Sequence, residues 1–206
     1  MFKTISENIT EELVEKKSKF IADVFYVESV EEAEEKIKEV EKKYYDARHH
    51  CYAFSIYEDS GVVNRFSDDG EPSGTAGGPM LNIINQKNLS NILVVVTRYF
   101  GGILLGTGGL VKAYSGAFQK ALEASNIVEK DLGLEISIVV SYADQDKAKY
   151  YLEQNSINIV NISYEETVNI TCEITKEKLN TIRDNMQNLN FKIEKIEEIK
   201  EKYIKI

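Results

Sequence analysis

The chain has 206 residues, of which 43% are hydrophobic and 29% charged, and its net charge is −9. This balance is that of a globular protein with one large domain or two small ones, and it argues against nucleic-acid binding over the whole surface. No stretch approaches the ~18 apolar residues of a membrane span, and the first ten residues hold no apolar run. We therefore expect a cytoplasmic protein without a signal peptide, in which Cys51 and Cys172 are free thiols.

The first half of the chain predicts strands and helices in alternation. Residues 20–27 are rich in β-branched and aromatic side chains and predict a strand. Ser29 and Glu32 have the spacing of a capping box, which predicts the start of a helix. Further strands are predicted at residues 51–57 and 92–100, and the near-continuous apolar run of the latter indicates burial on both faces.

The second half of the chain predicts a ferredoxin-like domain. The expected order is strand, helix, hairpin, helix and strand, at residues 134–142, 144–155, 157–174, 176–190 and 191–199. This βαββαβ order is typical of the ferredoxin-like fold. Both prolines and all but one glycine precede residue 117, so the composition changes near residues 126–134. We expect an α+β protein with two domains, residues 1–130 and 131–206.

A glycine- and proline-rich segment, SDDGEPSGTAGGP, occupies residues 67–79. Such a composition predicts a fixed loop with exposed backbone N–H groups. The carboxylates of Asp68, Asp69 and Glu71 are weak candidate ligands for a hard cation such as Mg²⁺. A structural turn with solvated acids is the favoured interpretation, and we expect neither a bound metal nor a cofactor. The surface of this loop is expected to comprise Asp68, Asp69, Gly70, Glu71, Pro72, Ser73, Gly74 and Thr75.

A second glycine-rich segment leads from the strand expected at 92–100 into a helix expected at 108–125. It is not a P-loop, because Thr107 stands where the phosphate-binding lysine would be. Free N–H groups at a helix start favour an anion, and glycine lets a phosphate approach the backbone closely. Tight turns and close packing of strand on helix explain the glycines equally well. The candidate residues for binding an anion or nucleic acid are Arg98, Tyr99, Gly101, Gly102, Gly106, Gly108, Gly109 and Lys112.

The segment DARHHCYAF, at residues 46–54, contains residue types that can carry catalysis. His49 and Cys51 would share one face of a strand, as a Cys–His nucleophilic pair requires, but a buried thiol is the favoured interpretation. For an enzyme, the candidate acid/base residues are His50 and Asp69.

Four segments in the same order resemble the YigZ/IMPACT family: KSKFIA (17–22), HCYAF (50–54), DDGEPSGTAGGPML (68–81) and RYFGGILLGTGGLVKAYSGA (98–117). The resemblance implies an N-terminal domain similar to domain IV of elongation factor G, a ribosomal-protein-like α+β fold, followed by a ferredoxin-like domain. Carried over by position, the functional surface of the family would include His50, Asp68, Asp69, Glu71, Arg98, Tyr99 and Lys112.

The resemblance also implies a translation-associated regulatory or binding protein. We expect it to contact RNA, the ribosome or another anionic partner through the glycine-rich surface; no DNA-specific signature and no membrane partner are expected. Two alternatives stay open: a metal-assisted, hydrolase-like enzyme acting on a small phosphorylated or peptide substrate, and a protein–protein adaptor. A binding role is favoured over an enzymatic one. The label of proline dipeptidase, which some members carry, has little support because no ligand set for a paired-metal peptidase is evident.

Overall fold

The computed structural model describes residues 1–58 and 61–206. It divides into two compact units, one formed by Phe2–Glu129 and the other by Met1 together with Lys130–Ile206. Each unit has its own antiparallel sheet and its own hydrophobic core, which confirms the expected two-domain α+β architecture. Within the described residues, no helix is both long and apolar enough to cross a membrane.

The first unit is built on a five-stranded antiparallel sheet. The strands lie in the order β2 (Ile9–Glu15), β3 (Ser18–Tyr26), β6 (Ile92–Tyr99), β4 (His49–Glu58) and β5 (Gly61–Ser67). A short strand, β1 (Phe2–Ile5), precedes them. The register pairs His49 with Arg98 and Lys19 with Tyr99, so residues distant in the sequence meet at the end of β6.

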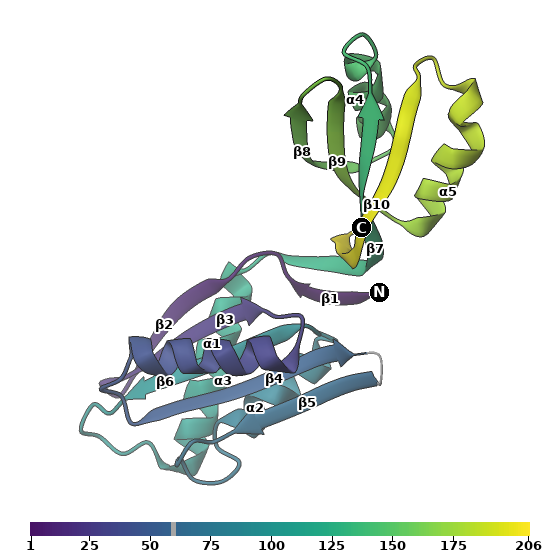
Figure 1. The fold of residues 1–206 in the computed structure, drawn as a ribbon. Coiled ribbons are helices and arrows are strands. Elements are labelled where there is room, and N and C mark those ends of the chain that lie inside the picture. The colour runs from purple at the N-terminus through teal and green to yellow at the C-terminus, as the bar shows by residue number, and fades with distance from the viewer. Residues whose placement is uncertain (59–60) are drawn as a thin grey trace. The chain divides into compact units, whose positions relative to one another are not determined.

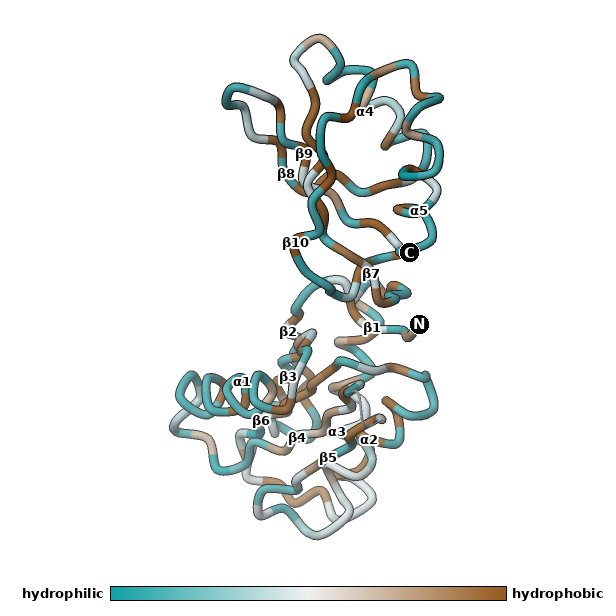
Figure 2. The backbone as a smooth tube through the Cα atoms, turned by 45° about the vertical axis from the view of Figure 1, so that its right-hand side comes forward, coloured by the Kyte–Doolittle hydropathy of each residue, from teal (hydrophilic) through white to brown (hydrophobic). Residues whose placement is uncertain are grey.

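Helices cover both faces of this sheet (Figure 1). The helix α1 (Val30–Lys43) packs on one face, while α2 (Gly77–Gln86) and α3 (Gly106–Ala124) pack on the other. The central strand β6 is buried from Ile92 to Arg98, as its apolar run predicted. Figure 2 shows α1 as a mainly hydrophilic coil with hydrophobic residues recurring along it, the pattern of a helix with one face on the core.

The sequence predictions for this unit are confirmed for the elements with a strong periodic pattern. The structure places strands and helices at the expected positions near residues 20–27, 51–57, 92–100 and 108–125. The prediction of a loop over residues 67–79 is wrong at its end, because α2 begins at Gly77. The strands β1, β2 and β5 and most of α2 were not predicted.

The second unit has the predicted βαββαβ order. Its elements are β7 (Ile127–Val140), α4 (Gln145–Gln154), β8 (Asn158–Tyr164), β9 (Val168–Ile174), α5 (Lys176–Asn185), a 3-10 turn η1 (Met186–Asn188) and β10 (Ile193–Lys205). In the strand order β10–β7–β9–β8, the two strands that follow the helices, β8 and β10, flank the central pair β7 and β9, as in a ferredoxin-like sheet. The ferredoxin-like prediction is therefore confirmed.

Candidate anion-binding site

Asp68 organises the first glycine-rich loop. Its carboxylate accepts hydrogen bonds from three backbone N–H groups, those of Gly74 at 2.7 Å, Ala76 at 3.0 Å and Gly77 at 2.8 Å. Gly77 is the first residue of α2, and Ala76 supplies no side-chain cap of its own. The free N–H groups at a helix start attract an anion, and here the anion is Asp68 itself.

The other two acidic residues of the loop are also bound by protein donors. Asp69 has a left-handed backbone conformation (φ 39°), and its carboxylate accepts the backbone N–H of His50 at 2.6 Å. Glu71 is buried and accepts hydrogen bonds from Arg98 at 2.6 Å and from the Tyr114 hydroxyl at 2.8 Å. In the described parts of the chain, no three His, Cys, Asp or Glu side chains form a group that could hold a metal ion. These carboxylates therefore hold the loop in place.

Arg98 connects this loop to a cavity. Its guanidinium lies between two aromatic rings, 5.6 Å from the centroid of Phe20 and 5.6 Å from that of Phe100. The Nη1 atom donates a hydrogen bond to Glu71, but the buried Nε atom has no hydrogen-bond partner. The positive charge of Arg98 is thus largely balanced within the protein, whereas one of its donors is unused.

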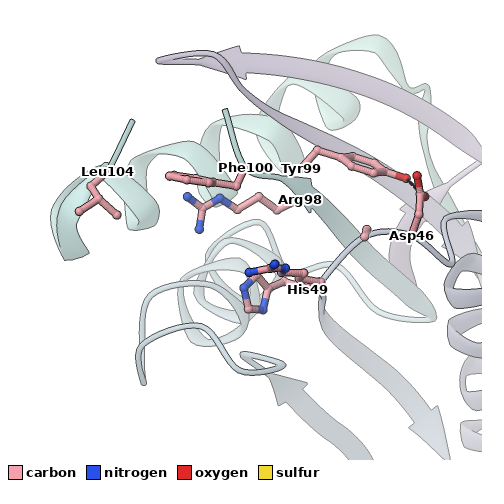
Figure 3. A pocket seen from close by; sticks show the side chains of 8 residues that line it. Asp46, His49, Arg98, Tyr99, Phe100 and Leu104 are labelled. Carbon is pink, nitrogen blue, oxygen red and sulfur yellow. Dashed lines mark hydrogen bonds between the residues drawn. The ribbon is translucent and has the colours of Figure 1, made fainter. Parts of the chain in front are cut away.

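The cavity has a volume of about 440 Å³, within the range of small-molecule pockets. In Figure 3 the Phe100 ring and His49 lie on opposite sides of the Arg98 guanidinium, and Asp46 and Leu104 mark opposite ends of the view. Phe100 and Leu104 are exposed, at 56% and 83%, and form its apolar wall. The residues lining the cavity are Asp46, Ala47, Arg48, His49, Arg98, Tyr99, Phe100 and Leu104.

Tyr99 and Asp46 form a hydrogen-bonded pair at one end of this cavity. The Tyr99 hydroxyl donates to Asp46 Oδ1 at 2.6 Å, and this hydrogen bond raises the pKa of Tyr99 to about 12. Tyr99 therefore stays a neutral hydroxyl at physiological pH. The structure gives the second carboxylate oxygen of Asp46 no partner among the described residues.

The histidines and Cys51 do not form a catalytic pair. The Cys51 thiol is buried and donates to the Asp68 carbonyl at 3.0 Å, and burial raises its pKa to about 12. His50 is also nearly buried, with Nε2 3.1 Å from the Tyr44 carbonyl. His49 lines the cavity, and its Nδ1 lies 2.7 Å from the Asp69 carbonyl. Because a carbonyl only accepts, His49 Nδ1 is the donor in this contact.

The glycines of the second segment fall into two groups. Gly101 is needed for packing, because a Cβ there would overlap the Lys17 carbonyl, and Gly109 is tightly packed, because a Cβ there would lie 3.1 Å from Leu105 Cβ. By contrast Gly102, Gly106 and Gly108 are exposed and have open space where a Cβ would stand. Gly106 opens α3, whose N-terminus has no side-chain cap. The second group therefore leaves backbone N–H groups accessible at a helix start.

Four cationic side chains accompany this exposed backbone. Lys112 lies six residues into α3 from Gly106, about 9 Å along the helix axis. Lys16 and Lys17 form the turn that packs against Gly101, and Arg48 lines the cavity. All four are exposed, and no ion pair within the described residues involves them. Of the predicted residues, Arg98 and Tyr99 line the cavity, whereas Lys112 and the glycines are not among the residues that line it.

Sequence reasoning did not select Arg48, Asp46, Phe100 or Leu104. The signal for Arg48 is its position beside His49, which becomes informative only once β4 is paired with β6 through His49 and Arg98. Phe100, expected at the end of the buried strand, and Leu104 could have been noted as large apolar residues beside glycines.

Both halves of the chain match known protein families. The Impact N-terminal domain family matches residues 16–122, and a domain of unknown function (DUF1949) matches residues 138–189. IMPACT family member YvyE of Bacillus subtilis (strain 168) is 34% identical over 186 residues, 90% of this chain and 85% of that protein. IMPACT family member YigZ of Escherichia coli (strain K12) is 41% identical over 155 residues, 74% of this chain and 76% of that protein. A crystal structure of a hypothetical protein aligns with a TM-score of 0.64 at 34% identity, covering 92% of each chain.

Proposed function

This chain belongs to the IMPACT family, and we propose that it is a translation-associated regulatory protein that binds RNA or the ribosome through one end of its first unit. The translation role follows from the family. The binding surface comprises Lys16, Lys17, Arg48, residues 100–108 and Lys112, and we call it the cationic end.

The observation that carries the proposal is the set of four cations without carboxylate partners in a chain of net charge −9. Two exposed lysines close to the turn at Lys16 and Lys17 or on α3 are paired with acids, Lys19 with Glu12 at 2.9 Å and Lys120 with Glu11 at 3.0 Å. The four cations of the cationic end have no such partners, so their charge is available to an anionic ligand.

The exposed backbone of the cationic end suits a phosphate ligand. The uncapped start of α3 presents N–H groups beside exposed Gly106 and Gly108, where no side chain keeps a ligand away. The start of α2, which is also glycine-rich, is already occupied by Asp68. Of these two glycine-rich helix starts, the α3 start is thus the one open to an external anion, and a sugar–phosphate backbone supplies several anions in a row.

No specific observation favours the enzymatic alternative. The three loop carboxylates are engaged by protein donors, His50 is nearly buried, and the Cys51 thiol has a raised pKa. A binding protein requires none of these groups to be free.

The test is binding of RNA and of ribosomes to the full chain across a salt series. The variant is Arg48→Ala/Lys112→Ala, and the matched control is Lys38→Ala/Lys42→Ala, which removes two exposed cations from α1 with the same change in net charge. We expect the wild type and the control to bind alike, with affinity falling as salt rises. Each phosphate contact removed should reduce the slope of log K against log salt by about 0.7–0.9.

The proposal fails if binding is absent at low salt, or if the control pair weakens binding as much as Arg48→Ala/Lys112→Ala. A ribosome interaction that resists both salt and nuclease treatment would indicate a protein–protein adaptor instead.

A further inference from the structure

We propose that the cavity between residues 46–49 and 98–104 binds a single ribonucleotide whose base is unstacked from its neighbours. This inference rests on the proposed function and specifies how the cationic end would recognise RNA. It identifies the ligand of the cavity as sugar, phosphate and base together, in place of a bare anion.

The size and walls of the cavity suit one nucleotide. Its volume of about 440 Å³ falls at the small end of ligand pockets, which span about 300–1,000 Å³. Phe100 is 56% exposed although it is a large aromatic residue, and the Arg98 guanidinium lies 5.6 Å from the centroid of its ring. An exposed aromatic ring in the wall of a cavity is a stacking platform for a base.

The polar groups of the cavity are divided by charge. Arg48 is an exposed cation without an ion pair, so it suits a phosphate. Asp46, at the Tyr99 end, would repel a phosphate, but its partner-free oxygen can accept a hydrogen bond from a sugar hydroxyl. A bare anion would leave the acid and the ring unused, whereas a ribonucleotide matches all three.

Through a hydrogen bond from the ribose 2′-hydroxyl, Asp46 would favour RNA over DNA. The 2′-hydroxyl is the group by which a protein distinguishes the two nucleic acids at a given position. Tyr99 holds Asp46 Oδ1 through its hydroxyl at 2.6 Å, which fixes the carboxylate for a single further donor. A deoxyribonucleotide lacks the hydrogen bond from the 2′-hydroxyl to the charged Asp46 carboxylate, and this loss should weaken binding about tenfold.

The experiment is an NMR or calorimetric titration of the full chain with adenosine 5′-monophosphate, its 2′-deoxy analogue, adenosine, and inorganic phosphate. We expect the ribonucleotide to bind about tenfold more tightly than the deoxy analogue and more tightly than either adenosine or phosphate alone. Asp46→Asn should remove most of the preference for the ribose. Phe100→Leu should weaken the nucleotide about tenfold while leaving phosphate binding unchanged.

Phe66→Leu is the matched control for Phe100→Leu, because Phe66 is an aromatic residue of similar exposure, 50%, on β5 outside the cavity lining. The inference is overturned if ribose and deoxyribose forms bind equally, if phosphate binds as tightly as the nucleotide, or if the Phe66 variant loses as much as the Phe100 variant. A phosphorylated peptide that displaces the nucleotide and binds more tightly would also overturn it.

The outcomes separate this inference from the proposed function. If RNA or ribosomes bind through Arg48 and Lys112 but no mononucleotide binds, the cavity proposal is wrong and the proposed function stands. If mononucleotides bind as described but neither RNA nor ribosomes do, the proposed function is wrong and the cavity is a small-molecule site.

Discussion

Glu71 and Arg98 form a buried ion pair that joins the first glycine-rich loop to the central strand of the sheet. The distance from Arg98 Nη1 to Glu71 Oε1 is 2.6 Å, and the two side chains are only 8% and 4% exposed. Tyr114 on α3 donates a second hydrogen bond to the same Glu71 oxygen. Strand, loop and helix are therefore tied together at one carboxylate.

Breaking this pair should strongly destabilise the first unit. We expect Arg98→Ala to lower the free energy of unfolding by about 3–5 kcal/mol, because it leaves the Glu71 carboxylate buried without its counter-charge. Chemical denaturation gives the measurement. Arg65→Ala is the control, since the Arg65–Glu34 pair is about half exposed and should contribute at most about 1 kcal/mol. Equal losses for the two variants would show that the Glu71–Arg98 pair has no structural role.

A consequence for binding studies follows from the same pair. Loss of RNA binding in an Arg98 variant would report damage to the fold as well as loss of a contact. Arg48 and Lys112 are exposed and unpaired, so substitutions there report contact alone.

Two glycines of the second segment should respond in opposite ways to alanine. At Gly101 the new methyl group would overlap the Lys17 backbone, which cannot move cheaply, so we expect Gly101→Ala to cost about 3 kcal/mol. At Gly108 the methyl group meets nothing within 4 Å and the backbone is helical, so Gly108→Ala should stabilise by about 0.5–1 kcal/mol. Thermal or urea unfolding of both variants tests this.

The same Gly108→Ala variant should bind RNA more weakly although it is more stable. Its methyl group would stand in front of the N–H groups at the start of α3 and hold a phosphate away. A variant that gains stability and keeps full affinity would show that the α3 start does not contact the ligand.

Both cysteine thiols should be unreactive in the folded protein. Burial raises the pKa of Cys51 to about 12 and that of Cys172 to about 12, so at pH 8 almost no thiolate is present. We expect no labelling by a thiol reagent in native buffer and labelling of both residues in denaturant. Rapid native labelling of Cys51 would reopen a nucleophilic role for it.

The ion pairs of Lys202 should make the stability of the second unit depend on pH. This lysine contacts Glu173 at 2.7 Å and Glu135 at 3.4 Å. Burial tends to raise the pKa of Glu173, but the hydrogen bonds from Lys202 and Asn158 outweigh it and leave the pKa below its ordinary 4.5. The hydrogen bond to Glu173 in turn raises the pKa of Lys202 above 10.5.

The lowered pKa of Glu173 and the raised pKa of Lys202 determine how the stability of the second unit depends on pH. The depressed Glu173 pKa gives stability that is complete above pH 4.5 and is lost as the pH falls through the folded-state pKa. The raised Lys202 pKa gives stability that is complete below pH 10.5 and is lost as the pH rises through its folded-state value. Lys202→Met should therefore destabilise by about 1 kcal/mol at pH 7 and by less at pH 3. A loss independent of pH would contradict this assignment.

The parts of the fold that the sequence predicted depend on local patterns. The Ser29 hydroxyl accepts the Glu32 backbone N–H at 3.1 Å, which is the capping interaction that their spacing indicated. The apolar run of β6 is buried on both faces for the same reason that it was recognised, because helices cover the sheet on each side. Local chemistry of this kind is visible in a single sequence.

The parts that were missed depend on partners distant in the chain. The start of α2 at Gly77 resembles a loop because its cap, Asp68, lies nine residues earlier. The ion pair of Arg98 joins residues 27 positions apart, so a cation that seemed free to bind an anion is largely neutralised. Arg48 reaches the cavity only through the pairing of β4 with β6.

The three backbone amides that share the Asp68 carboxylate affect how the first loop moves. A segment with so many glycines would ordinarily exchange its amide protons with solvent quickly, since little restrains its backbone. Here the protons of Gly74, Ala76 and Gly77 all depend on one acceptor. They should exchange together and slowly, as one cooperative opening unit, so this glycine-rich loop behaves as a rigid part of the domain.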